Sequence, residues 1–294
     1  MPSLYQSTNA KSLEGQREFL FWFRLRLFSL LAAAVGGAVS IPILGLRVGA
    51  AVAFLAFLSA LGSELVLAGR KPDRLWYEGR AAAESVKTLA WRFMVRGESF
   101  GREMAADQAE KALLKEFGEI LQDLDDLDLS SGAAGGPQVT PKMRTIRGLP
   151  FEQRRRFYQS DRIDSQKSWY AGKAVWNSKR ARNWTVVVIA SEILGVVLGG
   201  LVVVGTLDFD AVGVLAAVGA TVTAWVQAKQ HQNLATAYSI TSQELASISS
   251  EIDLITSESD WATFVGQSEE AISREHTLWR ASRGIRIQAR PQGG

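Results

Sequence analysis

Apolar residues are concentrated in four long blocks, and the chain between the blocks is polar and charged. The blocks cover residues 28–46, 48–67, 184–207 and 211–226. A membrane-spanning helix needs about 20 mostly apolar residues, with a range of about 17–25. The first three blocks meet this length, and the fourth, with 16 residues, is slightly short. The pattern predicts four membrane spans arranged as two tight hairpins.

Two other interpretations of these blocks fit less well. The first is that the blocks are four buried helices of a soluble core, but such helices seldom run this long without a charge. A signal peptide is the other. It fits poorly, because 27 largely polar residues precede the first block and a second block follows it at once.

Basic residues give the predicted orientation. Of the 33 lysines and arginines, 32 lie in residues 1–27, 68–183 and 227–294, and Arg47 alone lies in a turn between two spans. Positively charged segments stay on the cytoplasmic side of a membrane. We therefore expect both termini and the middle segment on the cytoplasmic side of the membrane.

The polar segments carry helical periodicity. Apolar residues recur at three-to-four spacing from Ala109 to Leu127, and again from Trp261 to Trp279. Residues 227–257 contain no helix breaker and predict a continuous helix after the fourth span. The predicted fold class is an all-α membrane protein of two transmembrane hairpins with long cytoplasmic helices, in an oligomer.

A stretch rich in glycine, serine and proline, residues 130–141, predicts a flexible linker between two similar units. On this basis residues 1–129 form a first hairpin with its cytoplasmic helices, and residues 142–280 form a second. Residues 281–294 are predicted to be a basic disordered tail.

Basic residues before the third span form a candidate lipid-headgroup site. The side chains in question are Arg154, Arg155, Arg156, Arg180 and Arg182. A basic run also suits nucleic acid. Its position next to a span favours anionic headgroups, which attract each such residue by about 1 kcal/mol. We expect a lipid bilayer as partner and no nucleic acid.

Composition argues against most familiar enzymes. The chain has no cysteine and two histidines, His231 and His276, and it carries no Walker-type or GxGxxG loop after a strand. The net charge of +3 does not indicate any class of enzyme. We expect no enzyme activity, no catalytic residue, no metal site and no cofactor.

Two glutamates interrupt the spans, Glu64 and Glu192. They lie six residues before Arg70 and eight residues after Trp184, or about 9 and 12 Å along a helix from the cytoplasmic end. One hypothesis places them on a cation-selective path as pore-lining residues. The other places them, protonated and hydrogen-bonded, between helices.

Glycines in the third span suggest close helix packing. Gly195 and Gly199 form a GxxxG pair, and Gly200 follows. Small residues let membrane helices approach closely, within a chain or between chains. Because four spans enclose little space, a water path needs several copies, and a homo-oligomer is expected.

Two segments resemble a known family. They are YQSDRIDSQKSWYAGKAVWNSKRARNW, residues 158–184, and SDWATFVGQSEEAISREHTLW, residues 259–279. They resemble the SLATT domain, the SMODS- and SLOG-associating two-transmembrane effector domain. The segment LWYEGRAAAESVKTLAWRF, residues 75–93, looks like part of a second, divergent copy.

The resemblance implies a membrane effector of a bacterial conflict or antiphage system that forms pores and depolarises the inner membrane. It also implies a nucleotide second messenger, or a separate nucleotide-sensing protein, as a partner. The alternative function is a non-conducting membrane scaffold or sensor, whose cytoplasmic helices recruit another protein.

Overall fold

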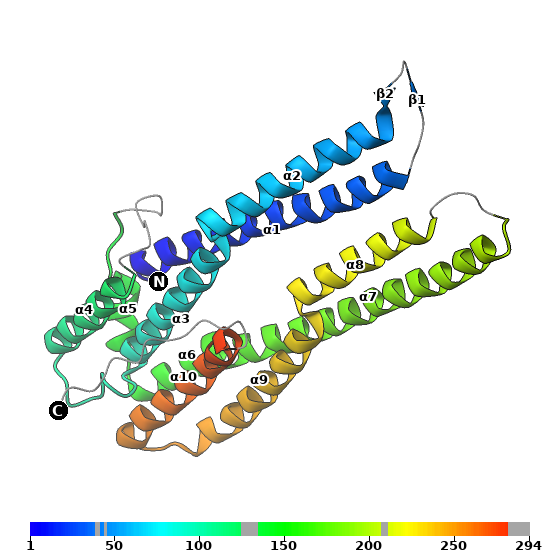
Figure 1. Cartoon of the computed structure of the whole chain (residues 1–294). Helices are drawn as coiled ribbons and strands as arrows, with labels where there is room; N and C mark the ends of the chain where they lie inside the picture. Colours follow the sequence, from blue (N-terminus) through cyan, green and yellow to red (C-terminus); the bar gives the residue numbers. More distant parts are fainter. Residues whose placement is uncertain (39–41, 44–45, 125–134, 207–210, 282–294) are drawn as a thin grey trace, which may run out of the picture. The chain divides into compact units, whose positions relative to one another are not determined.

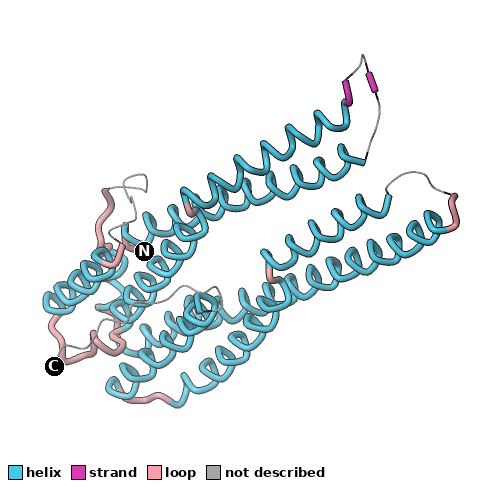
Figure 2. The backbone as a smooth tube through the Cα atoms, viewed as in Figure 1, coloured by secondary structure: helices cyan, strands magenta, loops and turns pink. Residues whose placement is uncertain are grey.

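Helices make up nearly all of the backbone (Figures 1 and 2). The computed structural model describes residues 1–38, 42–43, 46–124, 135–206 and 211–281. The elements in chain order are α1 (Ser3–Ala38), β1 (Pro42–Ile43), β2 (Leu46–Arg47), α2 (Val48–Arg70), α3 (Pro72–Val95), α4 (Ala106–Gln122), α5 (Pro141–Arg147), α6 (Phe151–Tyr158), the π-helix η1 (Gln159–Asp164), α7 (Ser165–Val203), α8 (Ala211–Lys229), α9 (His231–Glu251), the 3₁₀ turn η2 (Ile252–Leu254) and α10 (Glu258–Ala281). The predicted all-α fold is confirmed.

The chain forms two compact units, each assembled from separate segments. The hairpin unit comprises Gly15–Asp73 and Gly172–Thr236, and the helical unit comprises Met1–Glu14, Arg74–Ala171 and Ala237–Gly294. Helix α1 has 36 residues and α7 has 39. At 1.5 Å per residue these helices are about 54 and 58 Å long, well beyond the roughly 30 Å of a bilayer's hydrocarbon. Both helices therefore contribute their first turns to the helical unit.

In the first hairpin, α1 and α2 pack closely. The Ser29 hydroxyl donates to the Ser59 hydroxyl at 2.9 Å. A Cβ atom added at Gly36 would lie 2.8 Å from the Gly49 carbonyl oxygen and 3.0 Å from the Ala53 nitrogen. Glycine is required at position 36 because only a hydrogen leaves room for the facing backbone.

Both returning helices end at one residue in a left-handed conformation. Lys71 has φ 45° between α2 and α3, and Gln230 has φ 49° between α8 and α9. The N–H groups of these residues donate to the carbonyls of Leu67 and Val226, four residues earlier. The predicted uninterrupted helix over 227–257 is therefore wrong, because the helix breaks at Gln230. The sequence gives no sign of this break, since no glycine or proline lies there.

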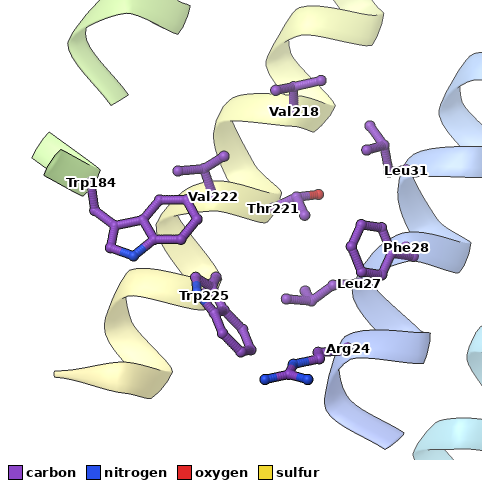
Figure 3. A pocket seen from close by; sticks show the side chains of 9 residues that line it. All are labelled: Arg24, Leu27, Phe28, Leu31, Trp184, Val218, Thr221, Val222 and Trp225. Carbon is purple, nitrogen blue, oxygen red and sulfur yellow. The ribbon is translucent and has the colours of Figure 1, made fainter. Parts of the chain in front are cut away.

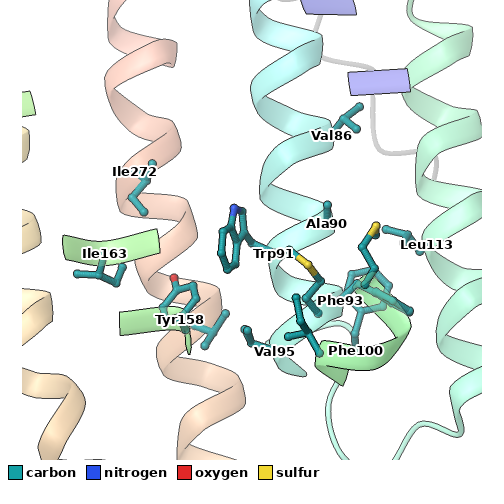
Figure 4. Close-up of a cluster of buried hydrophobic side chains, with 14 of the residues drawn as sticks. Val86, Ala90, Trp91, Phe93, Val95, Phe100, Leu113, Tyr158, Ile163 and Ile272 are labelled. Carbon is teal, nitrogen blue, oxygen red and sulfur yellow. The ribbon is translucent and has the colours of Figure 1, made fainter. Parts of the chain in front are cut away.

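The helical unit is built around one large hydrophobic core, and the described members of both predicted apolar stripes contribute buried residues to the unit. Leu113 and Phe117 of α4 are buried, as are Trp261 and Ile272 of α10. Figure 4 shows Trp91 of α3 beside Tyr158, and the two rings meet edge to face with centroids 6.0 Å apart.

The second half of the predicted linker is held in place. The Pro137 carbonyl accepts a hydrogen bond from the Ser3 N–H, and the Gln138 side chain accepts one from the Leu4 N–H at 3.1 Å. Val139 is buried. Residues 137–139 therefore have partners in the helical unit, residues 130–134 lie outside the described part, and flexibility over 130–141 stays a prediction.

Candidate functional site

The hairpin helices expose their apolar side chains. In the most apolar 18-residue windows of α7 and α8 no residue is buried. Val203 of α7 is 86% exposed, and Phe28 of α1 is 65% exposed. In the described part of the chain, four helices are long and apolar enough to cross a membrane. Hydrocarbon is the environment that covers such surfaces without the cost that water imposes.

Glu64 of α2 forms an ion pair with Arg26 of α1. Its carboxylate lies 2.7 Å from the Arg26 guanidinium, and the two side chains are 47% and 38% exposed. Glu192 of α7 is exposed. Within the described residues, no hydrogen bond or ion pair joins the two glutamates. The apolar blocks alone gave no sign of the Arg26 pairing, because this arginine lies two residues ahead of the first block.

The GxxxG glycines of α7 are not packed within the described part of the chain. A Cβ at Gly195 or Gly200 would meet no atom within 4 Å, and one at Gly199 would reach only the Val212 side chain at 3.9 Å. Gly36 of α1 instead provides the close approach. That the α7 glycines contact a helix of a neighbouring copy stays a prediction.

An apolar pocket of about 370 Å³ lies between the two hairpins within the hairpin unit (Figure 3). Side chains of α1, Trp184 of α7 and side chains of α8 line it. At one end the Arg24 guanidinium lies 5.1 Å from the Trp225 ring, and the Lys229 ammonium lies 4.9 Å from the same ring. Such cation–π contacts keep the two charges at the end of the apolar surface.

A buried charge network holds α10 in the helical unit. Arg162 of η1 donates to both Glu269 oxygens, at 2.8 and 2.6 Å. The Tyr158 hydroxyl donates to Glu269 at 3.1 Å, and the Thr88 hydroxyl donates at 3.2 Å. Both charged side chains are almost fully buried, at 2% and 0% exposure. The network joins α3, α6, η1 and α10.

The charges of this network shift two pKa values. Burial raises the pKa of Tyr158 well above its usual value, and the adjacent Glu269 carboxylate raises it further. Burial lowers the pKa of Arg162, but Glu269 and the other nearby acidic groups together outweigh burial and leave that pKa above its usual value. Tyr158 is therefore neutral and Arg162 charged, which suits a structural network rather than proton transfer.

The lipid-headgroup prediction is wrong for Arg154. Its side chain is 1% exposed and lies 2.5 Å from the Glu258 carboxylate, 104 residues away in sequence. Arg155 donates to the carbonyl of Ile255, 100 residues away, at 3.0 Å. No local pattern reveals partners at such separations. The remaining three candidates, Arg156, Arg180 and Arg182, are exposed, as a headgroup contact requires.

Two family models match the chain, one after the other. The model described as SMODS and SLOG-associating 2TM effector domain 3 matches residues 2–155, and that described as domain 1 of the same series matches residues 158–279. The chain belongs to the SLATT family. No curated protein and no solved structure matches it.

The two SLATT domains share one architecture. Each has a long helix, a membrane hairpin and a returning helix that ends at a left-handed residue, Lys71 in the first and Gln230 in the second. Each SLATT domain also contributes its hairpin to the hairpin unit and further helices to the helical unit. The expected pair of tandem SLATT domains is confirmed. The chain is a multi-pass membrane protein.

No metal centre is found in the described residues. They contain no group of three histidine, cysteine, aspartate or glutamate side chains able to hold an ion. His231 lies 2.8 Å from the Asn177 side chain through its Nδ1 atom, which ties the start of α9 to α7.

Proposed function

We propose that this chain is an oligomeric membrane effector of a bacterial conflict system, which forms or gates a pore in the inner membrane. SLATT two-transmembrane effector domains are associated with conflict systems. The observation that carries the proposal is that one chain joins two such domains, whose most apolar hairpin windows have few or no buried residues.

Several copies are needed to enclose a water path, because four spans leave too little room between them. The open glycine surface of α7 at Gly195 and Gly200 supports contacts between copies. Small residues permit the close helix approach that membrane interfaces use. An oligomer would bring this surface against a neighbouring helix.

Glu192 is the stronger candidate for the path. Its side chain is exposed, whereas the Glu64 charge is balanced by Arg26 at 2.7 Å. A carboxylate at this depth is costly in lipid and stable beside water. A ring of Glu192 side chains would favour cations over anions.

Ion flux in liposomes tests the proposal. Purified wild-type protein is expected to conduct, with Glu192→Gln losing most of its cation preference and Glu64→Gln losing less. Gln267→Asn, in the exposed part of α10, is a matched control that leaves the charge unchanged. Unchanged selectivity in both glutamate variants would contradict the acidic path.

Reporter fusions test the orientation separately. Fusions at residues 1, 135 and 294 are expected to be cytoplasmic, and an insertion at 208–210 is expected to be external, because the basic residues avoid the turns. A reversed pattern would contradict the orientation.

The Arg26–Glu64 ion pair favours a second candidate, a non-conducting scaffold or sensor. This ion pair balances the charge of Glu64, one of the two carboxylates within the predicted spans. On this hypothesis wild-type protein gives no flux under any activating condition, although its expression still alters the cell. The helical unit would then carry the activity by recruiting a partner.

A further inference from the structure

A cavity of about 360 Å³ in the helical unit is lined by four arginines and one carboxylate. The arginines are Arg96, Arg102, Arg144 and Arg147, and the carboxylate is Glu110. Glu110 neutralises only Arg144, which donates to its two oxygens at 2.7 and 2.8 Å. Three positive charges therefore face a cavity whose size falls in the range of small-molecule sites.

Arg147 is the buried member of this group. Its side chain is 5% exposed, and its Nη1 atom donates to the backbone carbonyls of Phe93 and Phe100, both at 2.9 Å. No ion pair involves it among the described residues. Burial, together with the charges of Arg96 and Arg154, lowers its pKa to about 10. An anion in the cavity would relieve this repulsion.

The N-terminus of α4 opens onto the same cavity. Ala105 precedes the helix and Ala106 begins it, and both line the cavity. Ala105 has no side-chain oxygen, so no side chain caps the first-turn N–H groups of this 17-residue helix. A helix N-terminus carries a partial positive charge and free donors, which bind phosphate oxygens.

We propose that this cavity binds a small anion bearing phosphate, held by Arg96, Arg102 and the first-turn N–H groups of α4. Guanidinium groups match phosphate oxygens in pairs, with strong charge-assisted hydrogen bonds. A soluble phosphate compound and a phospholipid headgroup share this chemistry. Binding at the cavity does not depend on whether the hairpins conduct.

The test uses the full chain in nanodiscs of neutral phosphatidylcholine, titrated with pyrophosphate in a calorimeter. Arg102→Gln is the main variant, because Arg102 is exposed and has no hydrogen bond or ion pair in the described structure. It is expected to weaken binding about tenfold, a typical loss for one charge-assisted contact. Glu110→Gln is expected to tighten binding several-fold, because it removes the one negative charge and frees Arg144. Lys115→Gln, which removes one positive charge from an exposed lysine of α4 outside the cavity, is the matched control and should bind as wild type does.

A second arm separates the two sources of phosphate. The melting temperature is measured in nanodiscs with and without anionic phospholipid, and with no soluble ligand. If anionic lipid raises the melting temperature of the wild type and of Lys115→Gln but not that of Arg102→Gln, the cavity binds a headgroup. Pyrophosphate binding with the same dependence assigns it to a soluble compound. Wild-type dissociation constants above about 1 mM with no lipid effect, or equal losses in Arg102→Gln and Lys115→Gln, would overturn the proposal.

Discussion

Replacing Glu269 by glutamine would leave the Arg162 guanidinium charged and buried without a counter-ion. Glu269 is 0% exposed and accepts hydrogen bonds from Arg162, Tyr158 and Thr88. An arginine cannot lose its proton in a protein, so the charge stays. Breaking a buried ion pair in this way costs about 3–5 kcal/mol.

Thermal unfolding of the protein in detergent, followed by circular dichroism, measures this cost. At about 2–4 °C per kcal/mol for a chain of this size, the helical unit of Glu269→Gln is expected to melt about 6–20 °C lower. Glu270→Gln is the matched control, because the neighbouring Glu270 is exposed. It is expected to change the melting temperature by less than about 2 °C.

A double change completes the design. Arg162→Met together with Glu269→Leu removes both charges, and apolar replacements of buried ion pairs are often neutral. It is therefore expected to recover most of the stability that Glu269→Gln loses. Equal melting temperatures for Glu269→Gln and Glu270→Gln, or a double variant no better than the single one, would refute the buried network.

The remaining predictions concern burial, packing and exposure. Arg154→Gln should lower the free energy of unfolding by about 2–3 kcal/mol, because it breaks a buried ion pair. Arg156→Gln should leave stability unchanged but weaken binding of the purified protein to anionic vesicles. Gly36→Ala should lower the melting temperature of the hairpin unit, because the added Cβ meets backbone at 2.8 Å, whereas Gly37→Ala has open space and should not. Limited proteolysis should cut within 130–136 before it cuts elsewhere, and resistance there would contradict the remaining linker prediction.

The sequence determined the features of this protein that depend on neighbouring residues. A membrane span needs one continuous apolar block, so the hairpins could be predicted from block length alone. The stripe of Leu113 and Phe117 and the buried Trp261 followed from helical spacing, because a helix places every third or fourth residue on one face. The motifs around the second hairpin likewise indicated the SLATT family, because each is a stretch of adjacent residues.

Only the tertiary structure decided which charges are exposed. Arg154 and Arg156 are two positions apart and look alike in the sequence, yet one is buried against Glu258 and the other is exposed. Arg162 meets Glu269 across 107 positions. The arginine cavity likewise draws its side chains from separate segments of the chain. The physical reason is that a charge is buried only where the fold brings it a counter-ion or carbonyl oxygens, and these partners come from distant segments.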